Sequence, residues 1–98
     1  MHKSYKCKSE VIVYPGMNGW RFLGLPQKDG KEIKEKFGTQ AKGWGSLPVL
    51  VTIGTTTWKT SIFPDKKSGT YLLPLKAEVR KKEGIVDKEK ISFTIQLR

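Results

Sequence analysis

Residues 91–97, Ile-Ser-Phe-Thr-Ile-Gln-Leu, alternate strictly between apolar and polar side chains. Successive side chains of an extended strand point to opposite faces, so this alternation places all four apolar side chains on one face. Strands with this pattern pack one face on a core and turn the other to solvent. The stretch therefore predicts a fold built from half-buried β-strands.

Five further segments upstream are apolar or alternate in the manner of strands. They are residues 5–14, 20–25, 47–53, 57–63 and 70–75. In the first of them, the pattern puts Tyr5, Cys7, Val11 and Val13 on one face. Turn-forming residues at 15–19 separate it from the second, which favours a β-hairpin.

Two short segments have the composition of helices instead. Lys31–Phe37 is amphipathic, with Asp29 as the expected N-cap and Gly38 as the expected stop. Lys76–Glu83 begins just past a proline and ends before Gly84. Six strands and two short helices in 98 residues predict one all-β domain over residues 1–98, a closed or nearly closed barrel.

The composition bounds the classes of function. A single histidine (His2) near the start and a single cysteine (Cys7) provide neither a nucleophile held by a base nor a metal-ligand cluster. We therefore expect a protein that is not an enzyme and that uses no cofactor and no metal. The sequence has neither a signal-peptide core nor an apolar run of membrane-spanning length, which predicts a cytoplasmic protein without a membrane partner.

The net charge of +10 has two interpretations. Such a charge favours association with polyanions, but it is spread along the chain, and lysine greatly outnumbers arginine. The charge is therefore either a binding surface or a solvated, solubilising one. A nucleic-acid interface would draw on the basic residues around the second helix, which are Lys76, Arg80, Lys81 and Lys82.

Large aromatic side chains are the other candidate feature. In a small barrel they usually fill the core, but interleaved with basic residues they can also stack on a ligand. We expect Trp20, Phe22, Trp58 and Tyr71 to be mainly core residues and Trp44, which lies between two glycines, to be the most exposed. A candidate ligand-binding face comprises Trp44, Trp58, Lys59, Thr60, Ser61 and Arg80.

Short motifs follow one another through the second half of the chain. They are Gly-Trp-Gly-Ser at 43–46, Thr-Ile-Gly at 52–54, Trp-Lys-Thr-Ser-Ile-Phe-Pro-Asp at 58–65, Gly-Thr-Tyr-Leu-Leu-Pro-Leu-Lys at 69–76 and Glu-Val-Arg-Lys-Lys-Glu-Gly at 78–84. With Gly-Trp-Arg-Phe at 19–22, this succession resembles the DUF1905 family of small bacterial and archaeal proteins. The resemblance runs from Tyr5 to Leu97 and implies a small β-barrel without an assigned activity or catalytic residues.

A weaker resemblance lies within the first. Residues 71–91 are similar to the strand, proline, short helix and strand of AbrB-like swapped-hairpin DNA-binding proteins. The same arrangement is also how a small barrel turns a corner. Two hypotheses result: a non-enzymatic module that binds a ligand or a protein partner, or a nucleic-acid-binding, AbrB-like protein of regulatory type. In either case the protein is a monomer or a homodimer.

Overall fold

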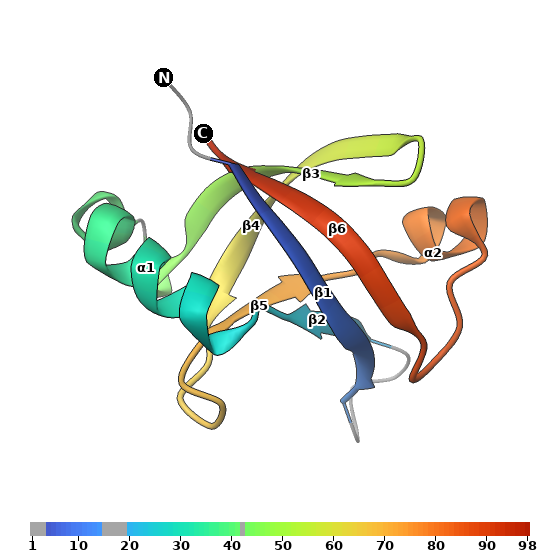
Figure 1. Ribbon diagram of the computed structural model, residues 1–98, viewed down its shortest axis with the longest axis horizontal. Helices are drawn as coiled ribbons and strands as arrows, with labels where there is room; N and C mark the ends of the chain where they lie inside the picture. The colour runs from blue at the N-terminus through green and yellow to red at the C-terminus, as the bar shows by residue number, and fades with distance from the viewer. Residues whose placement is uncertain (1–3, 15–19, 42) are drawn as a thin grey trace.

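The computed structural model describes residues 4–14, 20–41 and 43–98, with the backbone alone at Trp44. Six antiparallel strands form a closed barrel in the order β1-β2-β5-β4-β3-β6 (Figure 1). The strands are β1 (Ser4–Val13), β2 (Arg21–Gly24), β3 (Leu47–Ile53), β4 (Thr56–Pro64), β5 (Tyr71–Pro74) and β6 (Lys90–Leu97). The all-β class and the barrel are therefore confirmed.

The helices are short and lie on opposite sides of the barrel in Figure 1. They are α1 (Gln27–Phe37) and α2 (Ala77–Glu83), with two short 3₁₀ segments, η1 (Gly38–Gln40) and η2 (Gly43–Gly45). Within the described ranges, no helix is long and apolar enough to cross a membrane.

Strand β6 confirms the alternation from which its position was predicted. Ile91, Phe93, Ile95 and Leu97 are all buried. The strand pairs with β1 from Ser4–Gln96 to Glu10–Lys90, and the two ribbons cross the front of the barrel side by side (Figure 1). This long ladder places the start of β1 beside the end of β6 and closes the barrel.

The prediction that Val13 shares the buried face of β1 is wrong. Tyr5, Cys7 and Val11 are buried, whereas Val13 is 38% exposed. The pairing of β1 with β6 ends at Glu10, so Val13 lies beyond the part of β1 that β6 covers. The turn expected at residues 15–19 lies outside the described residues, but the antiparallel pairing of β1 with β2 agrees with a hairpin.

Helix α1 begins earlier than the sequence indicates. Pro26 is its N-cap, so Asp29, the expected N-cap, lies within the first turn. A proline at this boundary sacrifices no intrahelical hydrogen bond, because the first N–H groups of a helix have no partner within it. The predicted stop is confirmed at Gly38, whose N–H donates to the carbonyl of Lys34. Ile33 packs α1 on the core with no exposed surface.

Helix α2 covers the other side of the barrel. It begins after Lys76, buries Val79 and ends at Gly84, whose φ of 63° is the left-handed conformation that glycine adopts without strain. Near its end, the Thr56 hydroxyl donates a hydrogen bond to the Glu83 carboxylate. This contact joins α2 to the start of β4.

Candidate ligand-binding groove

The barrel wall is split between β4 and β5. Strand β4 pairs with β3 at seven positions, from Leu47–Ile62 to Ile53–Thr56. The described register with β5 has only two pairs, Phe63–Leu72 and Pro64–Tyr71. After Pro74 the chain leaves the sheet and enters α2, so residues 57–61 of β4 have a sheet neighbour on one side only.

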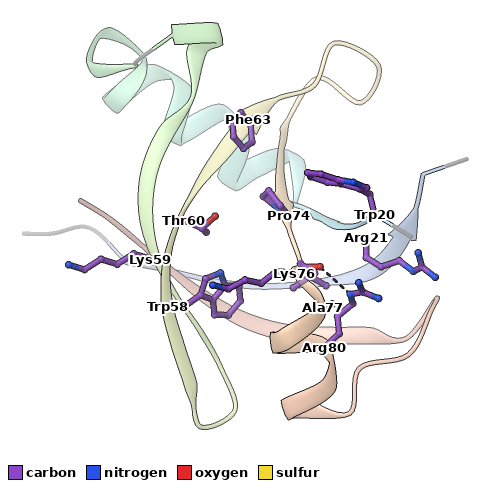
Figure 2. A pocket seen from close by; sticks show the side chains of 11 residues that line it. Trp20, Arg21, Trp58, Lys59, Thr60, Phe63, Pro74, Lys76, Ala77 and Arg80 are labelled. Atoms are coloured by element: carbon purple, nitrogen blue, oxygen red, sulfur yellow. Dashed lines mark hydrogen bonds between the residues drawn. The ribbon is translucent and has the colours of Figure 1, made fainter. Parts of the chain in front are cut away.

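A groove of about 530 Å³ occupies this split, and we call it the β4–α2 groove (Figure 2). Its walls come from three parts of the chain: the start of β2, the middle of β4, and the segment from the end of β5 into α2. The lining residues are Trp20, Arg21, Trp58, Lys59, Thr60, Phe63, Pro74, Leu75, Lys76, Ala77 and Arg80.

Strand β4 presents its edge to the groove. Three consecutive residues of this strand, Trp58, Lys59 and Thr60, line it. Consecutive side chains of a strand point to opposite faces, so a cavity that touches all three contacts the edge of the strand. The Trp58 ring is buried and Thr60 is half-buried, whereas Lys59 is exposed.

Exposed aromatic side chains extend the apolar surface of the groove. Trp20 is 54% exposed and Phe63 is 41% exposed. The Trp20 ring is stacked on Phe22, with ring centroids 6.0 Å apart, and Phe22 makes an edge contact with Tyr14. These contacts hold Trp20 in place at the rim, although half of its surface faces solvent.

Four basic residues line the groove, and the lining contains no aspartate or glutamate among the described residues. Arg21 is paired with Asp87, its Nε lying 2.6 Å from Oδ1. This pairing lowers the pKa of Asp87, chiefly through the hydrogen bond from Arg21. The Arg80 Nε donates to the carbonyl of Leu75 at 3.1 Å (dashed in Figure 2), which orients the guanidinium at the groove wall.

Lys76 and Arg80 stand on the same side of α2. The two positions are four residues apart, so they lie on one face of the helix, about one turn apart. In Figure 2, Lys76 reaches from the start of α2 toward Trp58, while Lys59 points away from the other lining side chains. The groove therefore combines apolar surface with positive charge from α2.

Most of the predicted ligand-binding residues come together here. Trp58, Lys59, Thr60 and Arg80 line the groove. Ser61 is half-buried and is not among the described lining residues. The side chain of Trp44 lies outside the described residues, so its expected exposure stays a prediction.

The candidate nucleic-acid residues do not form one group in the groove. Lys76 and Arg80 line it, whereas Lys81 and Lys82 are exposed and are not among its lining residues. At 100° per residue, Lys81 and Lys82 project from other sides of α2 than Lys76 does. Nucleic-acid binding stays a prediction that these positions do not test.

Part of the groove lining was not predicted from the sequence. Trp20, expected in the core, is instead exposed at the rim, and Arg21, Phe63 and Pro74 were not candidates. A signal existed for Phe63, because it alternates with the inward-facing Trp58, Thr60 and Ile62 and must point outward. The position of Trp20 depends on contacts between strands that the sequence does not display.

A second polar cluster lies between β1 and α1. The Tyr5 hydroxyl donates to the Glu32 carboxylate at 2.8 Å, and the Cys7 thiol donates to Asp29 at 3.6 Å. Burial, followed by the neighbouring Asp29 carboxylate, raises the pKa of Cys7 to about 12. Burial and Glu32 also raise the pKa of Tyr5, so both groups remain protonated at neutral pH.

Potential metal ligands are dispersed. No group of three or more His, Cys, Asp or Glu side chains in the described part of the chain is placed to hold a metal ion. The groove itself offers hydrogen-bond donors and apolar surface, which suit binding of an anion better than coordination of a cation.

The fold and groove together describe a small closed β-barrel in which β4 and β5 pair at two positions and then separate beside the short helix α2. The family model for a domain of unknown function, DUF1905, matches residues 8–95. The chain therefore belongs to the DUF1905 family, as its motifs indicated. No curated protein matched the sequence.

Proposed function

We propose that the protein is a binding module rather than an enzyme, and that the β4–α2 groove takes up an anionic ligand with an apolar part. The observation that carries the proposal is the composition of the groove: aromatic and aliphatic surface, four basic residues and no acidic residue among the described lining. Ligand sites are typically concave and mostly apolar, with a few polar groups that fix orientation.

Two exposed aromatic side chains, Trp20 and Phe63, provide the surface that the apolar part of the ligand would cover. Trp20 and Phe63 are large side chains with 54% and 41% of their surface in solvent. Covering apolar surface contributes about 25 cal/mol per Å² removed from water. A flat or branched apolar group that spans the groove between them gains this contribution.

The anionic part of the ligand is recognised by α2. Arg21 is already engaged by Asp87, and the charge of Arg80 also acts on that carboxylate, so Lys76 is the cation that we assign first to the ligand. Lys76 is exposed, and its flexible side chain places three hydrogen-bond donors and a positive charge within reach of a bound anion. Arg80 presents a planar guanidinium oriented by its bond to Leu75.

A fluorescence titration tests the proposal. Anilinonaphthalene sulfonate (ANS) combines an aromatic body with one negative charge, and its emission rises when it enters an apolar site. We expect saturable binding to the full chain, and we expect Lys76→Gln to weaken it about fivefold, corresponding to about 1 kcal/mol. Circular dichroism of the variant checks that the fold is kept.

Lys81→Gln is the matched control. It removes the same charge from the same helix, but Lys81 does not line the groove. We expect its ANS affinity to stay within about twofold of the wild type, because a surface charge outside the site acts only through a screened field. Equal weakening by both substitutions, or binding that does not saturate, would remove the support for this site.

A further inference from the structure

The open edge of β4 lies inside the groove. Its backbone N–H and C=O groups are available to a ligand that can form hydrogen bonds with a strand. In an antiparallel ladder, the N–H and C=O of one residue face one neighbouring strand, and those of the next residue face the other. The described hydrogen bonds determine which residues of β4 face the split.

A hydrogen bond just beyond the end of β4 shows which backbone groups of this strand face β5. The Asp65 N–H donates to the Thr70 carbonyl at 2.8 Å, so the N–H of Asp65 points toward the β5 side. Counting back in steps of two, Phe63, Ser61 and Lys59 face the same side. Phe63 meets β5 at Leu72, whereas Ser61 and Lys59 face the split.

The pairing of β3 with its two neighbours shows independently which backbone groups of β4 face the split. The Arg98 N–H donates to the Pro48 carbonyl at 3.1 Å, so Pro48 faces β6 and the next residue, Val49, faces β4. Val49 pairs with Thr60, and Val51 pairs with Trp58. Trp58 and Thr60 therefore bond to β3, and the backbone N–H and C=O groups of Lys59 and Ser61 point into the split.

From this arrangement, we propose that the occupant of the groove is an extended acidic polypeptide segment, which adds to β4 as a further strand. The inference rests on the proposed function and names its ligand. Addition of a strand to an exposed sheet edge is a general mode of peptide recognition, in which the main chain provides hydrogen bonds and alternate side chains provide specificity.

The length of the open edge fits a short segment. It runs from Thr57 to Ser61, because β5 takes the edge from Phe63 onward and Glu83 of α2 is bonded to Thr56 at the other end. Five residues of extended chain cover about 17 Å. These two contacts limit the stretch of β4 with which an added strand can pair to about five residues.

The side chains around the edge determine the pattern of the segment. A strand beside β4 would turn alternate side chains inward toward Trp58 and Thr60 and the others outward, on the side where Lys59 lies. Lys76 and Arg80 line the opposite wall of the split. The favoured segment therefore alternates apolar and acidic residues.

The apolar surface beyond the groove favours a polypeptide over a small molecule. Phe63, at the end of the groove, is 41% exposed, and Ile12 on β1 is 38% exposed. Strands β2 and β5 lie between β1 and β4 in the barrel. Phe22 and Leu72, on the two strands between them, are buried and add almost no exposed surface. A polypeptide that continues past the groove can contact these two exposed side chains, which a ligand confined to 530 Å³ cannot do.

Amide hydrogen exchange, followed by NMR on the nitrogen-15-labelled full chain, tests the inference. The probe is the blocked peptide acetyl-Glu-Val-Glu-Val-Glu-amide, and its charge-reversed counterpart acetyl-Lys-Val-Lys-Val-Lys-amide is the control. We expect the acidic peptide to displace ANS and to slow exchange at Lys59 and Ser61 by at least about tenfold. Exchange at Trp58 and Thr60, already bonded to β3, should stay unchanged.

The possible outcomes separate the inference from the proposed function. If the acidic peptide displaces ANS but leaves exchange at Lys59 and Ser61 as it was, strand addition is wrong. If ANS binds and the acidic peptide does not, or the basic peptide binds equally well, the acidic-segment ligand is wrong while the groove remains a site. If neither ANS nor the peptide binds, the proposed function fails as well.

Discussion

Gly30 is a residue whose identity is dictated by a single neighbour. It is buried in α1, and a Cβ atom at this position would fall on the hydroxyl of Thr70, the residue just before β5. Alanine in place of glycine within a helix ordinarily stabilises it by about 1 kcal/mol. Here the overlap with Thr70 reverses the sign, because α1 must move off the barrel to admit the methyl group.

We therefore predict that Gly30→Ala lowers the free energy of unfolding by about 1–3 kcal/mol in urea denaturation. Gly38→Ala is the control, since a Cβ there makes only an ordinary contact with Lys34 and the backbone is helical. That variant should be neutral or slightly stabilising. Equal effects at both positions would show that close packing on Thr70 is not the reason for Gly30.

Cys7 illustrates how burial controls reactivity. Its side chain is 5% exposed, and its pKa is raised to about 12 by burial and by Asp29. Because the thiolate is the nucleophile, we predict that iodoacetamide at about pH 8 labels the unfolded chain but not the folded one. Mass spectrometry of both samples measures this, and rapid labelling of the folded chain would contradict the burial of the thiol.

The same shift has a consequence for stability at high pH. The unfolded chain loses the Cys7 proton near the ordinary thiol pKa of about 9, and the folded chain only near 12. Between these values the unfolded state binds fewer protons, so the free energy of unfolding falls as pH rises. Cys7→Ala should flatten this part of the curve, measured by urea denaturation from about pH 8 to 11.

At the scale of elements, residues 57–61 of β4 pair with β3 on one side and have no neighbouring strand on the side of the split. Proline lacks the N–H that a ladder requires, and in sheets it is tolerated where that N–H would face away from a neighbour. We predict that Ser61→Pro, whose N–H faces the split, is tolerated better than Thr60→Pro, whose N–H bonds to β3. The difference in the free energy of unfolding should be about 2 kcal/mol.

The two prolines control for each other, because both lie in β4 and both restrict the same backbone angle. Urea denaturation at equal protein concentration provides the comparison. If the order is reversed, the alternation of backbone groups along β4 is wrong, and the inference of strand addition falls with it.

Elements with an internal pattern were predictable from the sequence. The strands expected at 47–53 and 91–97 are found there, and the strand expected at 57–63 extends by one residue at each end. Alternation is a local property, so it is visible in the sequence. The start of α1 was placed incorrectly because Asp29 and Pro26 both carry a start signal, and the choice between them depends on packing.

The candidate site was predictable only in part. Trp58, Lys59 and Thr60 were named from one strand, and Arg80 from the following helix. The groove that joins them exists because β5 leaves β4 after two register pairs. Where two strands separate depends on distant residues, which is why the exposed position of Trp20 and the role of Phe63 did not follow from their local sequence.

At the scale of the whole molecule, the charge of +10 acts on every anion that approaches. This field is screened over about 10 Å at 0.1 M salt, whereas a contact within the groove persists at higher ionic strength. We predict that raising the salt from about 0.05 M to 0.5 M weakens ANS binding. The ratio of affinities between the wild type and Lys76→Gln should nevertheless stay above about two.

Lys66→Gln, in the turn after β4, removes the same charge at a position that does not line the groove. Its ANS affinity should converge on that of the wild type as salt rises. If Lys66→Gln and Lys76→Gln behave alike at every salt concentration, the charge acts as a general field and not through the groove.

Mapping the bound probe by NMR tests most directly whether the β4–α2 groove is the binding site of this DUF1905 protein. The measurement is the change in backbone amide shifts of the nitrogen-15-labelled chain on titration with ANS. If the groove is the site, we expect the largest changes on the two walls of the split, at Lys59, Thr60, Lys76 and Arg80. Largest changes on α1, or changes spread evenly over the lysines of the surface, would contradict it.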